Sequence, residues 1–169
     1  MKSPNFATMI KYAGIIVISC AISLFGAIKA SEVNQKTKLR AEILRLICHI
    51  EAGIKYGSFH LSEIFGSFKS DLLEKNGFMT EIRSGCTDTG KIIESTLSAL
   101  STEEKTKLSQ FFSQLGKSYC REEEISLCKY YISSLKSIYE ANEKKDKAKA
   151  VLYKKLGIIC ALLTAIILF

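Results

Sequence analysis

The sequence is poor in the residues from which metal sites and disulfide frameworks are built. It has two histidines, His49 and His60, and its six cysteines never occur in the C-x-x-C spacing that is typical of zinc ligands. We therefore predict no metal site. We expect all six cysteines to be reduced thiols, which is their usual state in a cytoplasmic protein.

The chain also lacks a catalytic motif. Residues Gly85–Lys91 match the G-x-x-x-x-G-K pattern of a phosphate-binding loop, but Ile92 stands where Ser or Thr would hold magnesium, and no apolar strand precedes the loop. We would interpret the protein as an ATPase only if residues 31–150 bound nucleotide. We predict no catalytic residue, no cofactor and no small-molecule substrate, and we expect that the protein is not an enzyme.

No stretch alternates between apolar and polar residues as a half-buried β-strand does, whereas helical periodicity runs through the middle of the chain. We expect an all-α fold with five or six helices in one helical domain over residues 31–150. The expected helices are 33–55, one carrying Leu61 to Leu72, 78–82, 88–100, one begun by a capping box at Ser101 and Glu104, and a long helix from Arg121.

Charged residues are absent from the stretch Tyr12–Ile28 near the start of the chain. Its seventeen residues reach the lower limit of the roughly 17–25 that a helix needs to cross a bilayer. Snorkelling of Lys11 and Lys29 would lengthen it. We predict a transmembrane helix over residues 12–30, after a short extracytoplasmic N-terminus over residues 1–11.

A second uncharged stretch, Leu156–Phe169, ends the chain. It has fourteen residues and becomes long enough to span only if residues 151–153 enter the bilayer while Lys154 and Lys155 bend toward the headgroups. The alternative is a buried core helix, but this stretch is apolar on every face and follows a lysine-rich segment. We predict a second transmembrane helix over residues 151–169.

The lysines and arginines indicate how such a protein would be oriented. Most of those near the predicted spans lie between them, and such residues are retained on the cytoplasmic side. The central domain is therefore expected in the cytoplasm of a two-pass protein of the cell membrane. The alternative is a lipoprotein anchored at Cys20, which would place the domain outside the cell. The apolar region before that cysteine is, however, very short for a signal peptide.

The net charge of +7 does not indicate nucleic-acid binding, because the excess lies beside the predicted spans. From Leu46 to Glu143 the chain has 11 Lys plus Arg against 14 Asp plus Glu, a net charge of −3. The basic residues are suited to setting topology and to contact with anionic lipid.

The chain has a Leu-Gly turn, Leu115-Gly116, before an acidic helix start at Arg121, and a second Leu-Gly, Leu156-Gly157, at the entry into the apolar terminus. These ordered motifs resemble the stage III sporulation protein AB family. The sequence departs from the family pattern at His60, where Pro is usual, at Cys120, where Asp is usual, and by one inserted residue after Glu51. The matching residues are Glu51, Ile54 to Gly57, Leu61, Ser113 to Gly116, Arg121, Lys129 to Leu135 and Lys154 to Gly157.

The resemblance implies a non-enzymatic component of the channel between mother cell and forespore in endospore-forming bacteria. The family's helical domain is similar to those of inner-membrane platform proteins of type II secretion and type IV pilus systems. By that analogy the chain would dock a secretion-type ATPase and contact other channel membrane proteins, and the alternative is such a platform outside sporulation. The candidate contact residues are Arg121, Glu122, Glu123, Glu124 and Lys129.

Overall fold

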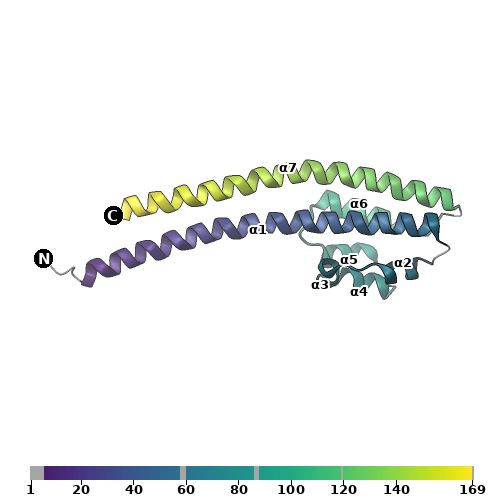
Figure 1. The fold of residues 1–169 in the computed structure, drawn as a ribbon, viewed down its shortest axis with the longest axis horizontal. Coiled ribbons are helices and arrows are strands. Elements are labelled where there is room, and N and C mark those ends of the chain that lie inside the picture. Colours follow the sequence, from purple (N-terminus) through teal and green to yellow (C-terminus); the bar gives the residue numbers. More distant parts are fainter. Residues whose placement is uncertain (1–5, 58–59, 86–87, 119, 169) are drawn as a thin grey trace. The chain divides into compact units, whose positions relative to one another are not determined.

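The computed structural model describes residues 6–57, 60–85, 88–118 and 120–168, apart from the side chains at 6–13, 15–16, 19, 22–23, 160–161, 164–165 and 167–168. Within these residues the chain forms helices and no strand, so the all-α prediction is confirmed (Figure 1). In chain order the helices are α1 (Phe6–Tyr56), α2 (Leu61–Ser67), α3 (Asp71–Lys75), α4 (Phe78–Arg83), α5 (Thr89–Thr96), α6 (Thr102–Gln114) and α7 (Arg121–Leu168).

The chain divides into two compact units. One, which we call the helical pair, consists of the described residues up to Gln35 and those from Glu143 onward. The other, which we call the core unit, is Lys36–Asn142. Because α1 and α7 each continue through both units, the long helix predicted from Arg121 is confirmed, whereas the helix predicted over 33–55 is only one part of α1.

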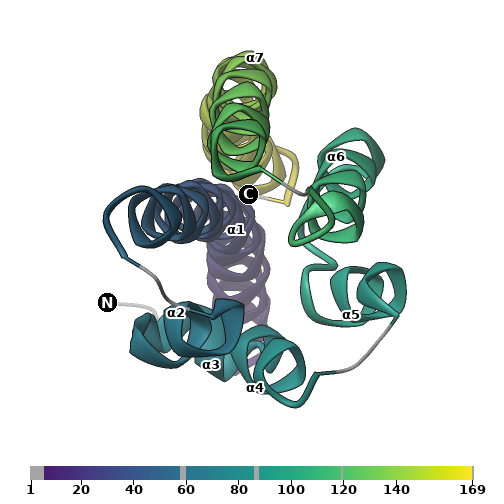
Figure 2. The same cartoon turned by 90° about the vertical axis from the view of Figure 1, so that its right-hand side faces the viewer.

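The core unit is built around the apolar stripe predicted on α1. Viewed along the helices, α2 to α6 follow one another around that core between α1 and α7 (Figure 2). On α7 the buried side chains recur at helical spacing and meet the same core. The best buried residues of these two helices are Ile43, Leu46, Ile47 and Ile50 on α1, and Cys128 and Leu135 on α7.

The helix predicted to carry Leu61 to Leu72 is broken in two, so that prediction is wrong. Arg83 stabilises the break between the two helices. Its guanidinium donates hydrogen bonds to the carbonyl oxygens of Phe65 at 3.1 Å and Phe68 at 2.6 Å. Carbonyl oxygens at the end of a helix have no hydrogen-bond partner within the helix, so Arg83 supplies one. The Ser70 hydroxyl then caps α3 by accepting from the amide of Leu73.

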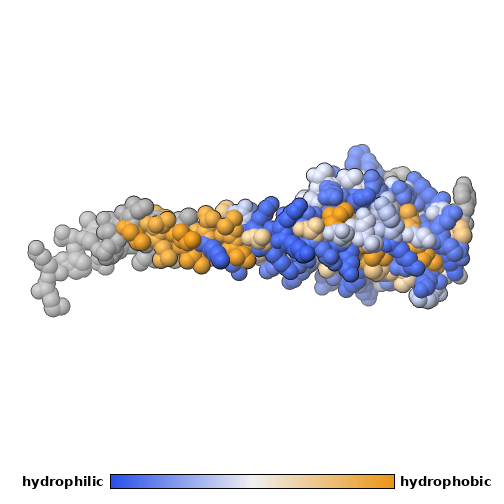
Figure 3. Space-filling view, turned by 90° about the horizontal axis from the view of Figure 1, so that it is seen from above, coloured by the Kyte–Doolittle hydropathy of each residue, from blue (hydrophilic) through white to orange (hydrophobic). Residues whose placement is uncertain are grey.

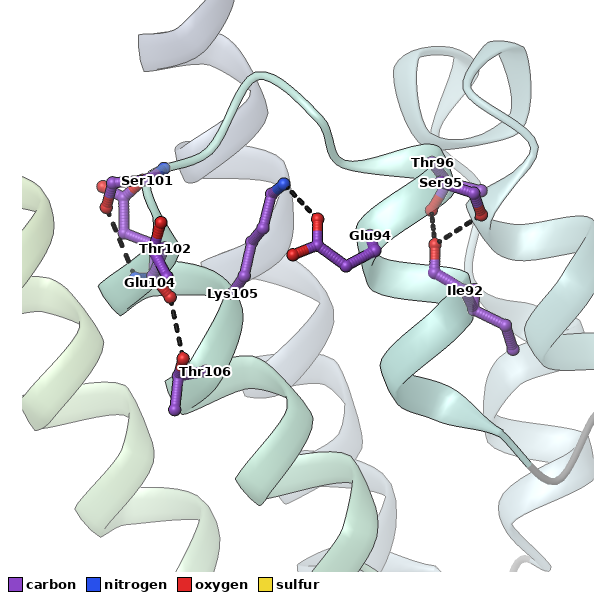
Figure 4. Close-up of polar contacts among 9 residues, drawn as sticks. All are labelled: Ile92, Glu94, Ser95, Thr96, Ser101, Thr102, Glu104, Lys105 and Thr106. Atoms are coloured by element: carbon purple, nitrogen blue, oxygen red, sulfur yellow. Dashed lines mark hydrogen bonds and ion pairs between the residues drawn. The ribbon is translucent and has the colours of Figure 1, made fainter.

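The α5–α6 region is drawn in Figure 4. Helix α5 ends at Thr96 and not at the predicted Leu100; the hydroxyls of Ser95 and Thr96 both donate to the carbonyl oxygen of Ile92 in this last turn. The predicted capping box at the start of α6 is confirmed: Ser101 and Glu104 each accept a hydrogen bond from the other's amide.

Neither long helix, over the residues that the structure describes, has a stretch that is both long and apolar enough to cross a membrane. The transmembrane helices predicted over 12–30 and 151–169 are therefore not supported as spans. Several side chains of both segments lie outside the described residues, as does the side chain of Lys11.

Candidate functional site

A hydrogen bond connects the first turn of α7 to the end of α1. Arg121 Nη2 donates a hydrogen bond of 3.0 Å to the carbonyl oxygen of Gly57, which directly follows α1. The two groups are 64 residues apart in sequence. Arg121, one of the predicted contact residues, therefore joins two loops at one end of the core unit.

Two of the predicted carboxylates on this turn face solvent. Glu122 accepts a hydrogen bond of 2.6 Å from the Cys120 thiol, and Glu123 is exposed. The bond from Cys120 is the main cause that holds the pKa of Glu122 below its usual range, with a further contribution from the charge of Arg121. Glu122 is therefore negatively charged at neutral pH.

Glu124 differs from its neighbours, although the sequence pattern placed it with them among the candidate contact residues. Only 8% of its surface is accessible, and its carboxylate accepts hydrogen bonds from the amide of Gly116 and from the Ser118 hydroxyl. A carboxylate in the first turn of a helix commonly accepts hydrogen bonds from backbone amides near that helix end. Glu124 therefore holds the α6–α7 loop, and any partner would meet Glu122 and Glu123 instead.

Gly116 makes the close approach of this loop to α2 possible. Its φ is +78°, in the region that side chains disfavour, and a Cβ atom there would lie 2.8 Å from Leu61 Cδ1. The Leu-Gly turn at Leu115-Gly116 therefore needs glycine for steric reasons. It places Arg121 within reach of Gly57.

Tyr56 is the residue that sequence reasoning missed as part of this site. It is the last residue of α1 and has 79% of its surface accessible, more than any other large apolar side chain described. The Lys55 ammonium lies 4.8 Å from the centre of its ring. The signal available in the sequence is that Tyr56 lies off the apolar stripe and next to a glycine.

We call the five residues that meet here the end surface. They bring together an exposed tyrosine and an arginine, two residue types that are enriched at protein interfaces, with a lysine and two carboxylates beside them. Lys129 is also exposed on α7, but it lies eight residues after Arg121, which is about 12 Å along the helix, so it is not part of this surface. The end surface consists of Lys55, Tyr56, Arg121, Glu122 and Glu123.

The core unit also contains a buried polar cluster that braces three helices. Glu104 of α6 is fully buried, and its carboxylate accepts from Arg40 Nε of α1 at 2.8 Å and from Asn142 Nδ2 of α7 at 2.9 Å. The Tyr139 hydroxyl lies near the Glu104 carboxylate, and burial raises the pKa of Tyr139 above its usual value. The capping box was predictable, but the burial of its carboxylate was not.

The phosphate-loop pattern forms an ordinary helix start. Asp88 caps α5 by accepting from the amide of Lys91 at 3.1 Å, and the Lys91 ammonium pairs with the same carboxylate at 2.9 Å. These contacts hold the pKa of Asp88 below its usual value. The helix α4 precedes the segment, where a nucleotide loop would follow a strand.

The core unit has open grooves on its surface. One of about 360 Å³ lies between α5 and α6 and is lined by hydroxyls that include Thr102, Thr106 and Ser109. Lys105 forms an ion pair with Glu94 between these helices (Figure 4). In the described part of the chain, no three His, Cys, Asp or Glu side chains are grouped so that they could hold a metal ion.

The cysteines that can be placed are free thiols. Cys20, Cys48 and Cys120 are exposed, whereas Cys128 is buried on α7. Burial is the main reason that the pKa of Cys128 rises to about 12, so this thiol stays protonated. Cys86 and Cys160 lie outside the described residues.

Comparison with known proteins gives one match. A family model described as stage III sporulation protein AB (spore_III_AB) matches residues 11–169, which include both units of the structure almost entirely. No curated protein and no solved structure matches the chain.

Proposed function

The chain belongs to the stage III sporulation protein AB family, and from this premise we propose that it is a non-enzymatic component of the mother cell to forespore channel. Membership supports a role in sporulation, and the family match over residues 11–169 is the observation that carries the proposal. In this proposal the helical pair anchors the protein in the membrane, and the core unit docks a secretion-type ATPase.

The distribution of exposed apolar side chains supports the membrane anchor. Apart from Tyr56 and Tyr130, every large apolar side chain found exposed belongs to the helical pair. Soluble proteins rarely expose such surfaces together. We propose that both chain ends enter the bilayer and that the core unit lies in the cytoplasm of the mother cell.

The end surface supports the docking of a partner. Its Tyr56 ring and its Glu122 and Glu123 side chains are exposed, while Arg121 and Glu124 fix the loops that carry them. An exposed aromatic residue among charged groups is typical of a contact that contributes strongly to binding. We propose that the ATPase contacts this surface, as the likeness to secretion platforms implies, and that other channel membrane proteins contact the helical pair.

The sporulation role is tested by deletion of the gene in an endospore-forming host and complementation with the intact chain. We expect heat-resistant spores to fall sharply after engulfment and vegetative growth to stay normal. Spore numbers that do not change would contradict the proposal and favour a secretion or pilus platform outside sporulation.

The docking surface is tested by charge reversal in the full chain. We expect Glu122→Lys/Glu123→Lys to weaken binding to the channel ATPase by tenfold or more, which corresponds to about 1.4 kcal/mol. The matched control is Glu81→Lys/Glu103→Lys, which makes the same charge change at two other exposed carboxylates of the core unit. Equal effects of the two pairs on co-purification of the ATPase would show that the end surface is not the docking site.

A further inference from the structure

Three consecutive apolar residues of α7 are exposed in the helical pair, directly before Lys154 and Lys155. Val151, Leu152 and Tyr153 are consecutive, so they project about 100° apart, yet 53%, 56% and 47% of their surfaces are accessible. Apolar surface gathers over this unit on the face drawn in Figure 3. A helix with this pattern is suited to lipid around most of its circumference.

Helices α1 and α7 touch through their backbones in this unit. A Cβ atom on Gly26 would lie 3.1 Å from the carbonyl oxygen of Tyr153 and 3.8 Å from Cα of Gly157. This contact fixes the level at which the two helices face each other. Lys29, about one turn from Gly26, and Lys154, next to Tyr153, therefore lie close to the same level along the pair.

The lysines at this level differ in their partners. Lys29 pairs with Glu32 at 3.0 Å. Lys154 and Lys155 are exposed, and no carboxylate among the described residues forms an ion pair with either. Apolar side chains precede and follow both lysines, so that the two ammonium groups lie where an apolar surface begins.

We propose that Lys154 and Lys155 bind the phosphate groups of anionic phospholipids at the surface of the bilayer that the helical pair enters. The lysine stems can lie along the apolar residues while their ammonium groups reach the headgroups. This inference rests on the membrane location in the proposed function. It adds the residues that select the anionic lipid expected from the sequence.

The other lysines of α7 supply a matched comparison. From Glu143 to Lys155 the helix has six lysines against Glu143 and Asp146, a net charge of +4. Lys144 and Lys145 are exposed, but they precede Lys154 and Lys155 by ten residues, about 15 Å of helix. That distance exceeds the screening length of about 8 Å at physiological salt. Lys144 and Lys145 should therefore matter much less for lipid selection.

The test uses the full chain in detergent micelles with equal amounts of phosphatidylglycerol and phosphatidylcholine, and bound lipids are counted by native mass spectrometry. We expect the chain to retain phosphatidylglycerol preferentially. Lys154→Gln/Lys155→Gln should reduce this preference by about fivefold or more, since each lysine near a membrane surface has an effect of that order. Lys144→Gln/Lys145→Gln should leave it within about twofold.

Two results would overturn the inference: no preference in the intact chain, or equal losses in the two variants. Fractionation of cells separates this failure from failure of the proposed function. A chain that sediments with membranes but shows no lipid preference removes only the lipid inference. A chain that does not sediment with membranes removes the proposed anchor, and the lipid inference with it.

Discussion

Helices α1 and α7 pass through both units, and the two units give them opposite amino-acid patterns. In the core unit they turn large apolar side chains inward, such as Ile43 and Leu135, each with no accessible surface. Among the side chains of α1 that the structure describes in the helical pair, the buried positions are Gly26 and Ala30, while Phe25 beside Gly26 has 62% of its surface accessible. The same secondary structure is therefore stabilised in two ways.

The proposed membrane location would explain this difference, because it gives the two units different surroundings. Burial of apolar surface away from water holds the core unit together. Helices that meet through small residues gain from close backbone contact, which is the mode of association where the surroundings are as apolar as the side chains. Substitutions of the same chemical kind should therefore have different effects in the two units.

The largest difference is expected for paired carboxylates. Glu104→Leu removes the carboxylate that Arg40 binds inside the core unit, together with a helix cap, and should lower the free energy of unfolding by about 3–5 kcal/mol. Glu32→Leu removes the exposed partner of Lys29 in the helical pair and should cost less than about 1 kcal/mol. Urea unfolding of the full chain in micelles, followed by far-UV circular dichroism, measures both.

The conservative change Glu104→Gln separates charge from shape. It keeps the size of the side chain and one acceptor oxygen, so a loss close to that of Glu104→Leu would assign the effect to the buried charge. If Glu104→Leu left the urea midpoint unchanged, the cluster would not brace the core unit, and this side of the comparison would fail.

A smaller difference is expected for leucine truncation. Leu46 has no accessible surface, and Leu46→Ala should lower the free energy of unfolding by about 3 kcal/mol because it leaves a cavity. Leu162 has 60% of its surface accessible in the helical pair, and Leu162→Ala should change that free energy by less than about 0.5 kcal/mol. Equal losses in the same urea experiment would show that the helical pair has a packed core like that of the core unit.

The sequence allowed prediction of those features that depend on neighbouring residues. The helical periodicity of residues 33–55 and the capping box at Ser101 are local patterns, and both are present. The break between α2 and α3 depends on Arg83, which reaches back to the carbonyl oxygens of Phe65 and Phe68. No local pattern contains that contact, so the break was missed.

The candidate site shows the same limit. Arg121, Glu122 and Glu123 were predicted as contact residues at the start of a helix, but that pattern does not distinguish the exposed Glu122 and Glu123 from the buried Glu124. The distinction arises from the loop that Gly116 folds against α2. Tyr56 joins the site only because Arg121 binds the carbonyl oxygen of Gly57.

The smallest difference is expected between two glycines of α1 in the helical pair. Gly26→Ala places a methyl group 3.1 Å from the carbonyl oxygen of Tyr153, and because this atom belongs to the backbone the helices must separate slightly, at a cost of about 1 kcal/mol. Gly14→Ala is the matched control: a Cβ there meets nothing within 4 Å, and alanine favours a helix over glycine by about 0.5–1 kcal/mol. Dyes attached at Ala21 and Leu162 of the full chain would report separation of the helices as the fraction of sodium dodecyl sulfate in mixed micelles rises. Gly26→Ala should lower the fraction at which they separate and Gly14→Ala should not, whereas equal midpoints would show that close backbone contact does not hold the pair together.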